Sequence, residues 1–247
     1  MASAPCMPKR FVVPASDFSE LPHFLGDIEL PEALTAAAQQ LHDTTTPDST
    51  LQVAVRLAVQ LLPGAEHAGI SVLERDGRRR SIARTDEVVR SVEEADGAHA
   101  QASCWDQLWH APVVRLTDSE TEEGGRSLAD AGLRSALALR LRAEKRRLTV
   151  LTAYAGKPRA FDADATRIGR LFTAHVSLAL DSATVREQLT EAMRTRDLIG
   201  QATGILMERK DIDAAEAFDS LVRTSQRENV KLRDIARRIV DAKRNAT

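Results

Sequence analysis

The chain has 247 residues, of which 43% are hydrophobic and 28% are charged, and its formal net charge is −2. This balance is typical of a folded globular protein and argues against a wholly disordered or fibrous chain. No membrane span is expected, because Arg56 and Gln60 interrupt the best apolar run at 51–62, and the N-terminus lacks the apolar core of a secretory signal. We therefore expect a cytoplasmic protein, in which any nucleic-acid-binding surface is local.

Motifs for catalysis or metal binding are missing from the sequence. The two cysteines, Cys6 and Cys104, are too far apart to form a CxxC pair, a metal knuckle or a disulfide framework. There is no P-loop, no glycine-rich dinucleotide motif and no spacing that favours a Ser–His–Asp triad. The sequence thus predicts no catalytic residue, no metal site and no evident cofactor.

Charge is distributed unevenly along the chain. Residues 1–50 hold two basic and seven acidic side chains, whereas 223–247 hold eight basic and three acidic ones. Such asymmetry suggests that the two ends do different jobs. Five prolines up to Pro31 are spaced too closely for a long helix, so residues 1–31 are predicted to form a flexible extension.

Between 32 and 160 the hydrophobic period changes from helical to strand-like. Helices are predicted at 32–42 and 49–62, the second ended by Pro63-Gly64. Asp76-Gly77 predicts a hairpin between strands at 69–74 and 78–84, and a second hairpin is expected at 135–142 and 146–155. Shorter helices near 86–95, 103–109 and 126–131 and a strand at 113–116 lie between the hairpins. These elements predict an α+β domain with an antiparallel sheet flanked by helices.

One face of the 135–142 strand is expected to be buried and the other mostly solvent-exposed. The pattern carrying this expectation is the alternation of leucines at 137, 139 and 141 with Ala138, Arg140 and Arg142.

From Asp162 onward the pattern is helical. Asp162 is a plausible N-cap, and nine positions from 171 to 199 alternate spacings of four and three, six of them apolar. This predicts a coiled-coil helix of about 67 Å that dimerises the chain. The proposed dimer seam consists of Leu171, Leu178, Val185 and Leu189. The alternative is a helix broken near 182, with its halves packed on separate domains.

Two shorter helices complete the chain and predict an all-α unit. Asp213 and Glu216 have the spacing of a capping box, Phe218 is expected in the core with Ala214, and Asn229 is expected to end this helix. A last helix starts at about 231. Packed on the end of the long helix, these two make a three-helix module.

The stretch 189–242 resembles the ANTAR RNA-binding domain. The residues that carry the resemblance are Ala192, Arg196, Ile199, Ala202, Gly204, Ile205, Leu206, Met207, Ala217, Leu221, Ser225, Asn229, Leu232, Ala236 and Ile239. The family often has Lys before the glycine of its A-K-G motif, where this chain has Thr203. We assign residues 183–247 to this module.

Residues 32–182 resemble a GAF sensor domain, through QASCWDQLW, AGLRSALALRL and YAGKPRAFD. Together the two resemblances imply a homodimeric transcription antitermination regulator of actinobacterial type. Such a protein binds tandem hairpins in nascent RNA under the control of its sensor domain. Cys104 and Trp105 mark the candidate sensor pocket, for which a small-molecule ligand is conceivable but not identified.

The candidate RNA-binding residues are mostly basic side chains on or near the three helices of this module. A helix that starts at 231 would offer free backbone N–H groups to phosphate, and Arg233 and Arg237 lie one turn apart on it. Since Phe218 is expected in the core, base stacking would have to use arginine planes. The candidates are Arg196, Thr203, Arg209, Lys210, Arg227, Asn229, Lys231, Arg233 and Arg237.

Two other interpretations stay open. In one, the protein is a small-molecule or redox sensor whose helical C-terminus binds a protein partner, an interpretation that Thr203 favours. In the other, it is an enzyme that reduces free oxidised methionine through Cys104, which the lack of a second nearby thiol disfavours.

Overall fold

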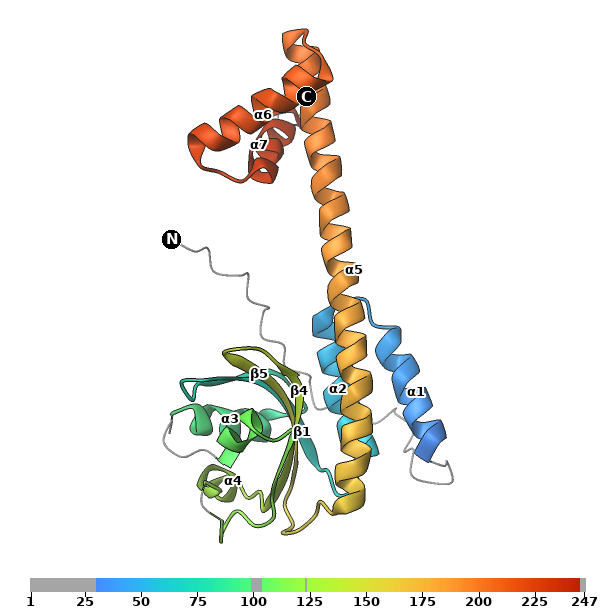
Figure 1. Ribbon diagram of the computed structural model, residues 1–247, viewed down its shortest axis with the longest axis vertical. Helices are drawn as coiled ribbons and strands as arrows, with labels where there is room; N and C mark the ends of the chain where they lie inside the picture. The colour runs from blue at the N-terminus through green and yellow to red at the C-terminus, as the bar shows by residue number, and fades with distance from the viewer. Residues whose placement is uncertain (1–29, 99–103, 123, 245–247) are drawn as a thin grey trace. The chain divides into compact units, whose positions relative to one another are not determined.

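The computed structural model describes residues 30–98, 104–122 and 124–244 (Figure 1). The chain forms two compact units, an N-terminal unit that ends at Thr184 and a C-terminal unit that begins at Val185. Helix α5, Ala163–Lys210, contributes to both. Among the described residues, no helix combines the length and apolar character needed to cross a membrane.

The N-terminal unit is built on a five-stranded antiparallel sheet in the order β2-β1-β5-β4-β3. Both predicted hairpins are present, and Gly77 adopts a positive φ of 84° in the first turn, which favours glycine. The predicted helices and strands of this unit are confirmed within a few residues. The strands are β1 His67–Glu74, β2 Arg79–Arg84, β3 Val113–Leu116, β4 Ser135–Ala143 and β5 Arg147–Ala155.

Helices cover both faces of this sheet (Figure 1). On one face α1 Leu30–His42, α2 Pro47–Leu61 and the first part of α5 pack on a core that includes Leu137 and Leu139. On the other, α3 Glu87–Ala98, the 3₁₀ helix η2 Cys104–Trp109 and α4 Arg126–Asp130 accompany a second core that includes Ala136 and Ala138.

The expectation of a mostly solvent-exposed second face on β4 is therefore wrong. Ala138 is fully buried, and Arg140 is half-buried with its Nη1 donating to the Leu108 carbonyl at 2.9 Å. Only Arg142, near the end of the strand, is exposed as expected. Alternation identified the leucine face correctly, but small alanines beside leucines also suit a face that a second layer of helices covers.

The C-terminal unit consists of the last part of α5, α6 Ala214–Glu228 and α7 Leu232–Arg244. Its core is small: one buried cluster consists of Ala202, Leu221, Ile235, Ala236 and Val240, and Ala217 of α6 is buried as well. Local signals for helix ends are confirmed: the Asp213 side chain accepts the Glu216 N–H at 2.8 Å, and Asn229 ends α6 in the left-handed conformation.

Phe218 is not in this core, contrary to expectation. Its exposed fraction is 43%, and Ala214 is exposed as well. The buried stripe of α6 runs through Ala217 and Leu221. Phe218 follows Ala217 by one residue, so it is rotated by about 100° around the helix and leaves the buried stripe.

Candidate nucleic-acid interface

A polar groove of about 430 Å³ lies between α5 and α7 within the C-terminal unit. Two of the nine predicted RNA-binding residues, Arg233 and Arg237, lie in it. The groove adds a third cation, Arg194, and an amide, Gln201, which sequence reasoning missed. The residues that line it are Glu191, Arg194, Thr195, Asp197, Leu198, Gln201, Arg233 and Arg237.

The two predicted arginines in the groove are held by weak ion pairs. Arg233 Nη1 lies 3.6 Å from Glu191 Oε1, and its Nε lies 3.9 Å from Asp234 Oδ1. Arg237 Nη1 lies 3.8 Å from the same Asp234 oxygen. Since the arginine side chains are 41% and 60% exposed, such pairs stabilise little and leave the guanidinium groups accessible to an incoming anion.

The other predicted RNA-binding residues lie outside this groove. Arg196 and Arg209 are exposed on α5, and Lys210 Nζ donates to Ser220 Oγ at 3.4 Å. Arg227 lies 3.7 Å from Glu228, and Lys231 is exposed just before α7. The nine residues therefore do not form one cluster around the groove.

Thr203 has a local role in α5. Its side chain is half-buried, and its Oγ1 donates to the Ile199 carbonyl at 2.9 Å. The single hydroxyl hydrogen is thereby used within the helix, so Thr203 has no hydrogen left for a phosphate in this conformation.

Asn229 holds the turn between α6 and α7. It has a φ of 52°, its N–H is directed at the carbonyls of Ser225 and Gln226, and its side chain is exposed. Ser225 Oγ donates to the Val230 carbonyl at 2.6 Å across the same turn. Asn229 thus has a conformational role besides any contact with a base.

Trp105, one of the two residues predicted to mark a sensor pocket, is 2% exposed and belongs to the second hydrophobic core. The side chain of Cys104 lies outside the described part of the structure. Beneath Trp105 the guanidinium of Arg79 lies 5.3 Å from the ring centre and forms a buried ion pair of 3.2 Å with Glu93. Arg79 also donates to the hydroxyls of Ser71, Thr152 and Tyr154 at 2.8–3.2 Å.

Gly69 allows this ion pair to form. A Cβ at this position would lie 2.6 Å from Val89 Cγ1 and 2.9 Å from Glu93 Oε1. Only glycine therefore allows α3 to approach β1 this closely. Sequence reasoning missed Arg79 and Glu93, because no local pattern links two residues of opposite charge fourteen positions apart. Among the described residues, no group of three or more His, Cys, Asp or Glu side chains could hold a metal ion.

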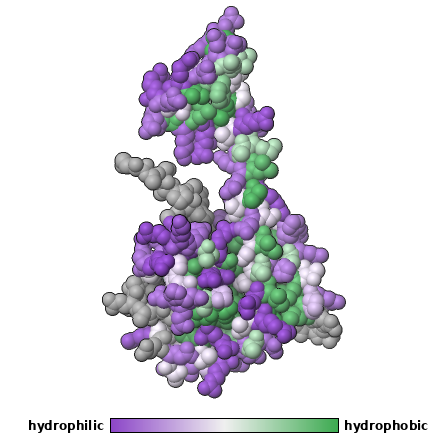
Figure 2. Space-filling view, viewed as in Figure 1, coloured by the Kyte–Doolittle hydropathy of each residue, from purple (hydrophilic) through white to green (hydrophobic). Residues whose placement is uncertain are grey.

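The predicted dimer seam lies on the surface of α5. The exposed fractions of Leu171, Leu178, Val185 and Leu189 are 47%, 68%, 62% and 61%. Figure 2 shows apolar side chains at the surface of this helix. Four large apolar residues at heptad spacing are thus exposed, with no cover from the part of the chain that the structure describes.

Comparison with family models identifies both parts of the chain. A GAF domain model matches residues 44–181, more than half of the chain, and an ANTAR domain model matches 187–240. No curated protein sequence matches the chain.

Solved structures with a similar fold include two of the bacteriophytochrome RpBphP3 from R. palustris. Its chromophore-binding domain aligns with a TM-score of 0.50 at 10% identity, over 62% of this chain and 61% of that one. A longer RpBphP3 structure aligns with a TM-score of 0.56 at 10% identity, over 73% of this chain and 43% of that one. The phytochrome photosensory core module of Stigmatella aurantiaca aligns with a TM-score of 0.54 at 10% identity, over 77% of this chain and 43% of that one.

The chain thus spans between about two fifths and three fifths of these relatives, and at such identity the likeness shows the fold alone. The family models show more. The chain belongs to the GAF domain family and carries a C-terminal ANTAR domain, the architecture of a GAF–ANTAR regulator.

Proposed function

We propose that the protein binds structured RNA through its ANTAR domain and so controls transcription termination, favouring paired hairpins in a nascent transcript. The observation that carries this proposal is the α5–α7 groove, in which Arg194, Arg233 and Arg237 converge while their acidic neighbours pair only weakly. A phosphate would replace Glu191 beside Arg233 and gain a charge-assisted hydrogen bond. The protein would act in the cytoplasm and without catalysis.

The exposure of Phe218 extends the means by which this domain can hold RNA. Phe218 is the one aromatic residue from 185 to 247, and 43% of it is exposed. An unpaired base can stack on such a ring as well as on an arginine plane. Asn229, with an exposed side chain, remains our candidate for reading a base edge.

We further propose that the protein is a homodimer and that the GAF domain, over 32–182, governs the ANTAR module over 183–247, with 1–31 as a flexible extension. The exposed apolar residues of α5 support the dimer, because a second copy of the same helix would cover them in a two-stranded seam. The ligand of the GAF domain, if it takes one, would be a small molecule near Trp105.

The RNA proposal is tested with the full chain in an electrophoretic mobility assay with tandem-hairpin RNA at several salt concentrations. Binding should weaken steeply with salt, since each neutralised phosphate releases counterions. Arg233→Ala should weaken binding and reduce the slope of log K against log salt by about 0.7–0.9. Arg223→Ala, which removes the same charge from an exposed position of α6 outside the groove, is the matched control and should leave the slope unchanged.

If the full chain binds tandem-hairpin RNA no better than a scrambled RNA at low salt, the RNA function is wrong. The helical module would then bind a protein partner.

The dimer is tested by replacing both Val185 and Leu189 with Lys. Light scattering should then give the mass of one chain, because two charged side chains in the seam would lie against their copies. An unchanged dimer mass would assign the interface to another surface, and a monomeric wild type would refute the dimer itself.

A further inference from the structure

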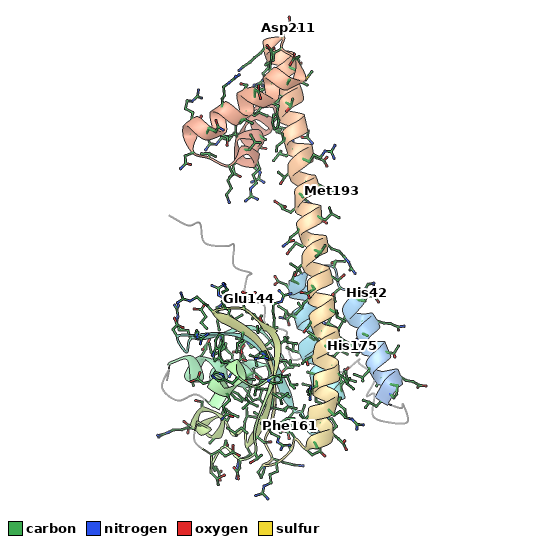
Figure 3. All side chains as sticks on the ribbon, in the orientation of Figure 1. His42, Glu144, Phe161, His175, Met193 and Asp211 are labelled. Atoms are coloured by element: carbon green, nitrogen blue, oxygen red, sulfur yellow. The ribbon has the colours of Figure 1, made fainter. Side chains whose placement is uncertain are left out.

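Two hairpin tips of the GAF domain lie side by side and form one surface, which we call the hairpin-tip patch and define as residues 74–78 and 142–147. β1 pairs with β5 so that Glu74 lies opposite Arg147, and the Arg75 N–H donates to the Arg146 carbonyl at 3.1 Å. Figure 3 places Glu144 at the tip of the β4–β5 hairpin. Residues about seventy positions apart in the sequence therefore share one end of the sheet.

This patch is strongly basic. It holds three acidic residues, Glu74, Asp76 and Glu144, and every residue from 142 to 147 is exposed. Figure 2 shows hydrophilic side chains over this part of the N-terminal unit. The six basic residues of the patch are Arg75, Arg78, Arg142, Lys145, Arg146 and Arg147.

Three of the six cations have carboxylate partners among the described residues. Arg78 Nη2 lies 2.9 Å from Glu74 Oε2 and 2.8 Å from Asp76 Oδ2. Arg147 Nε lies 3.6 Å from Glu74 Oε1, and Arg142 pairs with Asp181 of α5. Among the described residues, no carboxylate lies within ion-pair distance of the three other cations, which are Arg75, Lys145 and Arg146.

Backbone hydrogen bonds close the two turns that carry these cations. The Glu74 N–H donates to the Arg78 carbonyl at 2.8 Å, and the Glu144 N–H donates to the Arg147 carbonyl at 2.8 Å. The guanidinium of Arg75 lies 5.4 Å from the ring centre of Trp109, so its plane is held over an aromatic face. With strands about 4.8 Å apart, the four strands β2, β1, β5 and β4 place these groups on a surface about 14 Å wide.

The composition of the patch favours nucleic acid over protein as its partner. Protein interfaces have an apolar centre depleted in Lys and Glu, whereas all side chains of the patch except Gly77 and Ala143 are charged. Interfaces with nucleic acid are more polar and much more positive. We propose that the hairpin-tip patch of the GAF domain binds the phosphate backbone of RNA, as a second contact surface besides the ANTAR groove.

This proposal rests on the RNA-binding function and makes the GAF domain a direct participant in it. Contacts of this kind position the RNA without reading its sequence, so they raise affinity for longer or more structured RNA. The sensor domain would thus contribute to the strength of binding through its own charges.

The test compares salt dependence in two double variants of the full chain with the same tandem-hairpin RNA. Lys145→Ala with Arg146→Ala should weaken binding roughly tenfold at 0.1 M salt and lower the slope by about 1.4–1.8, the value of two lost phosphate contacts. Lys157→Ala with Arg167→Ala removes the same charge from the same unit, with Lys157 beyond the opposite end of β5, and should change neither. Lys145→Arg with Arg146→Lys keeps the charges and should keep the slope.

The outcomes separate this proposal from the RNA function. An unchanged slope in the Lys145/Arg146 double alanine variant, together with weaker binding by Arg233→Ala, refutes the patch and leaves the ANTAR groove as the RNA site. Absence of RNA binding by the wild type refutes both proposals. If the double alanine variant loses binding to poly-glutamate but not to RNA, the patch is a docking surface for an acidic protein segment. Unchanged tryptophan fluorescence shows that the variants are folded.

Discussion

The two units of the chain differ most in how they are held together. The N-terminal unit has two hydrophobic clusters, one on each face of its sheet, and buries a charged pair, Arg79 and Glu93, beside one of them. The C-terminal unit has six buried residues among those that the structure describes, and three of them are alanines. A large core can surround a charged pair with polar partners, as the hydroxyls around Arg79 do, whereas a small helical core relies on caps and on contacts between exposed side chains.

Contacts at the surface of the C-terminal unit illustrate this reliance. Ion pairs join α7 to α5 through Arg233 with Glu191 and Lys243 with Glu208, and Arg238 pairs with Glu228 of α6 at 2.9 Å. Lys243 also holds the pKa of Glu208 below its usual value by hydrogen bonding to the carboxylate. Some of these cations are the ones that RNA would contact. Under the proposed RNA function, binding and stability would use the same side chains in this unit, whereas the GAF core would use its buried pair for stability alone.

The aromatic residues allow the two units to be followed separately. Both tryptophans, Trp105 and Trp109, lie in the N-terminal unit, and the C-terminal unit has neither Trp nor Tyr. Tryptophan fluorescence thus reports the GAF domain alone, whereas circular dichroism at helical wavelengths reports both units. If the units are independent, the two probes should give different transitions.

The largest expected effect is on the GAF core. Glu93→Ala should lower the free energy of unfolding of the N-terminal unit by about 3–5 kcal/mol, because it leaves the Arg79 guanidinium buried without its carboxylate. Urea denaturation followed by tryptophan fluorescence measures this loss. A change below 1 kcal/mol would mean that the pair contributes little to the fold.

Leu221→Ala should destabilise the C-terminal unit by about 2–5 kcal/mol, since it truncates one of its few large buried side chains and leaves a cavity. The transition seen by circular dichroism should shift to lower urea while the fluorescence transition stays in place. A joint shift of both transitions would show that the units unfold together, and the comparison above would then fail.

The α6–α7 turn provides a smaller and more specific test. Asn229→Ala should cost about 1 kcal/mol, because alanine resists the left-handed conformation, whereas Asn229→Gly should cost only a few tenths. Both variants lack the side-chain amide. If that amide contacts RNA, its loss should weaken binding equally in both variants. Weaker RNA binding in the alanine variant only would assign the effect to the backbone.

The smallest effect concerns pH and the GAF domain alone. His67 Nδ1 lies 2.6 Å from Asp86 Oδ2, and this hydrogen bond raises the pKa of His67 above its usual value despite partial burial. The resulting stabilisation, below about 1 kcal/mol, is complete below pH 6.5 and is lost as the pH rises through the folded-state pKa. Urea titrations of wild type and His67→Asn should therefore converge with increasing pH. A difference that is constant from pH 5 to 9 would exclude this linkage.

Sequence alone determined the elements and the family, because the signals for them are local. Asp76-Gly77 specifies a hairpin turn, the side chains of Asp162 and Asp213 each accept an N–H group from the first turn of α5 and α6, and Asn229 tolerates a positive φ. Each of these depends on a few neighbouring residues and on backbone geometry. The same holds for the order of residues by which the ANTAR and GAF resemblances were identified.

Tertiary structure decided what lies next to what. The second layer of helices buries Ala138, and the orientation of α6 leaves Phe218 exposed. The packing of α7 on α5 places Arg194 and Arg233 in the same groove. Buried pairing of Arg79 with Glu93 required a close approach of α3 to β1 over Gly69, and the hairpin-tip patch required the pairing of β1 with β5. These contacts join residues that are distant in sequence, and their energies come from packing that no local pattern encodes.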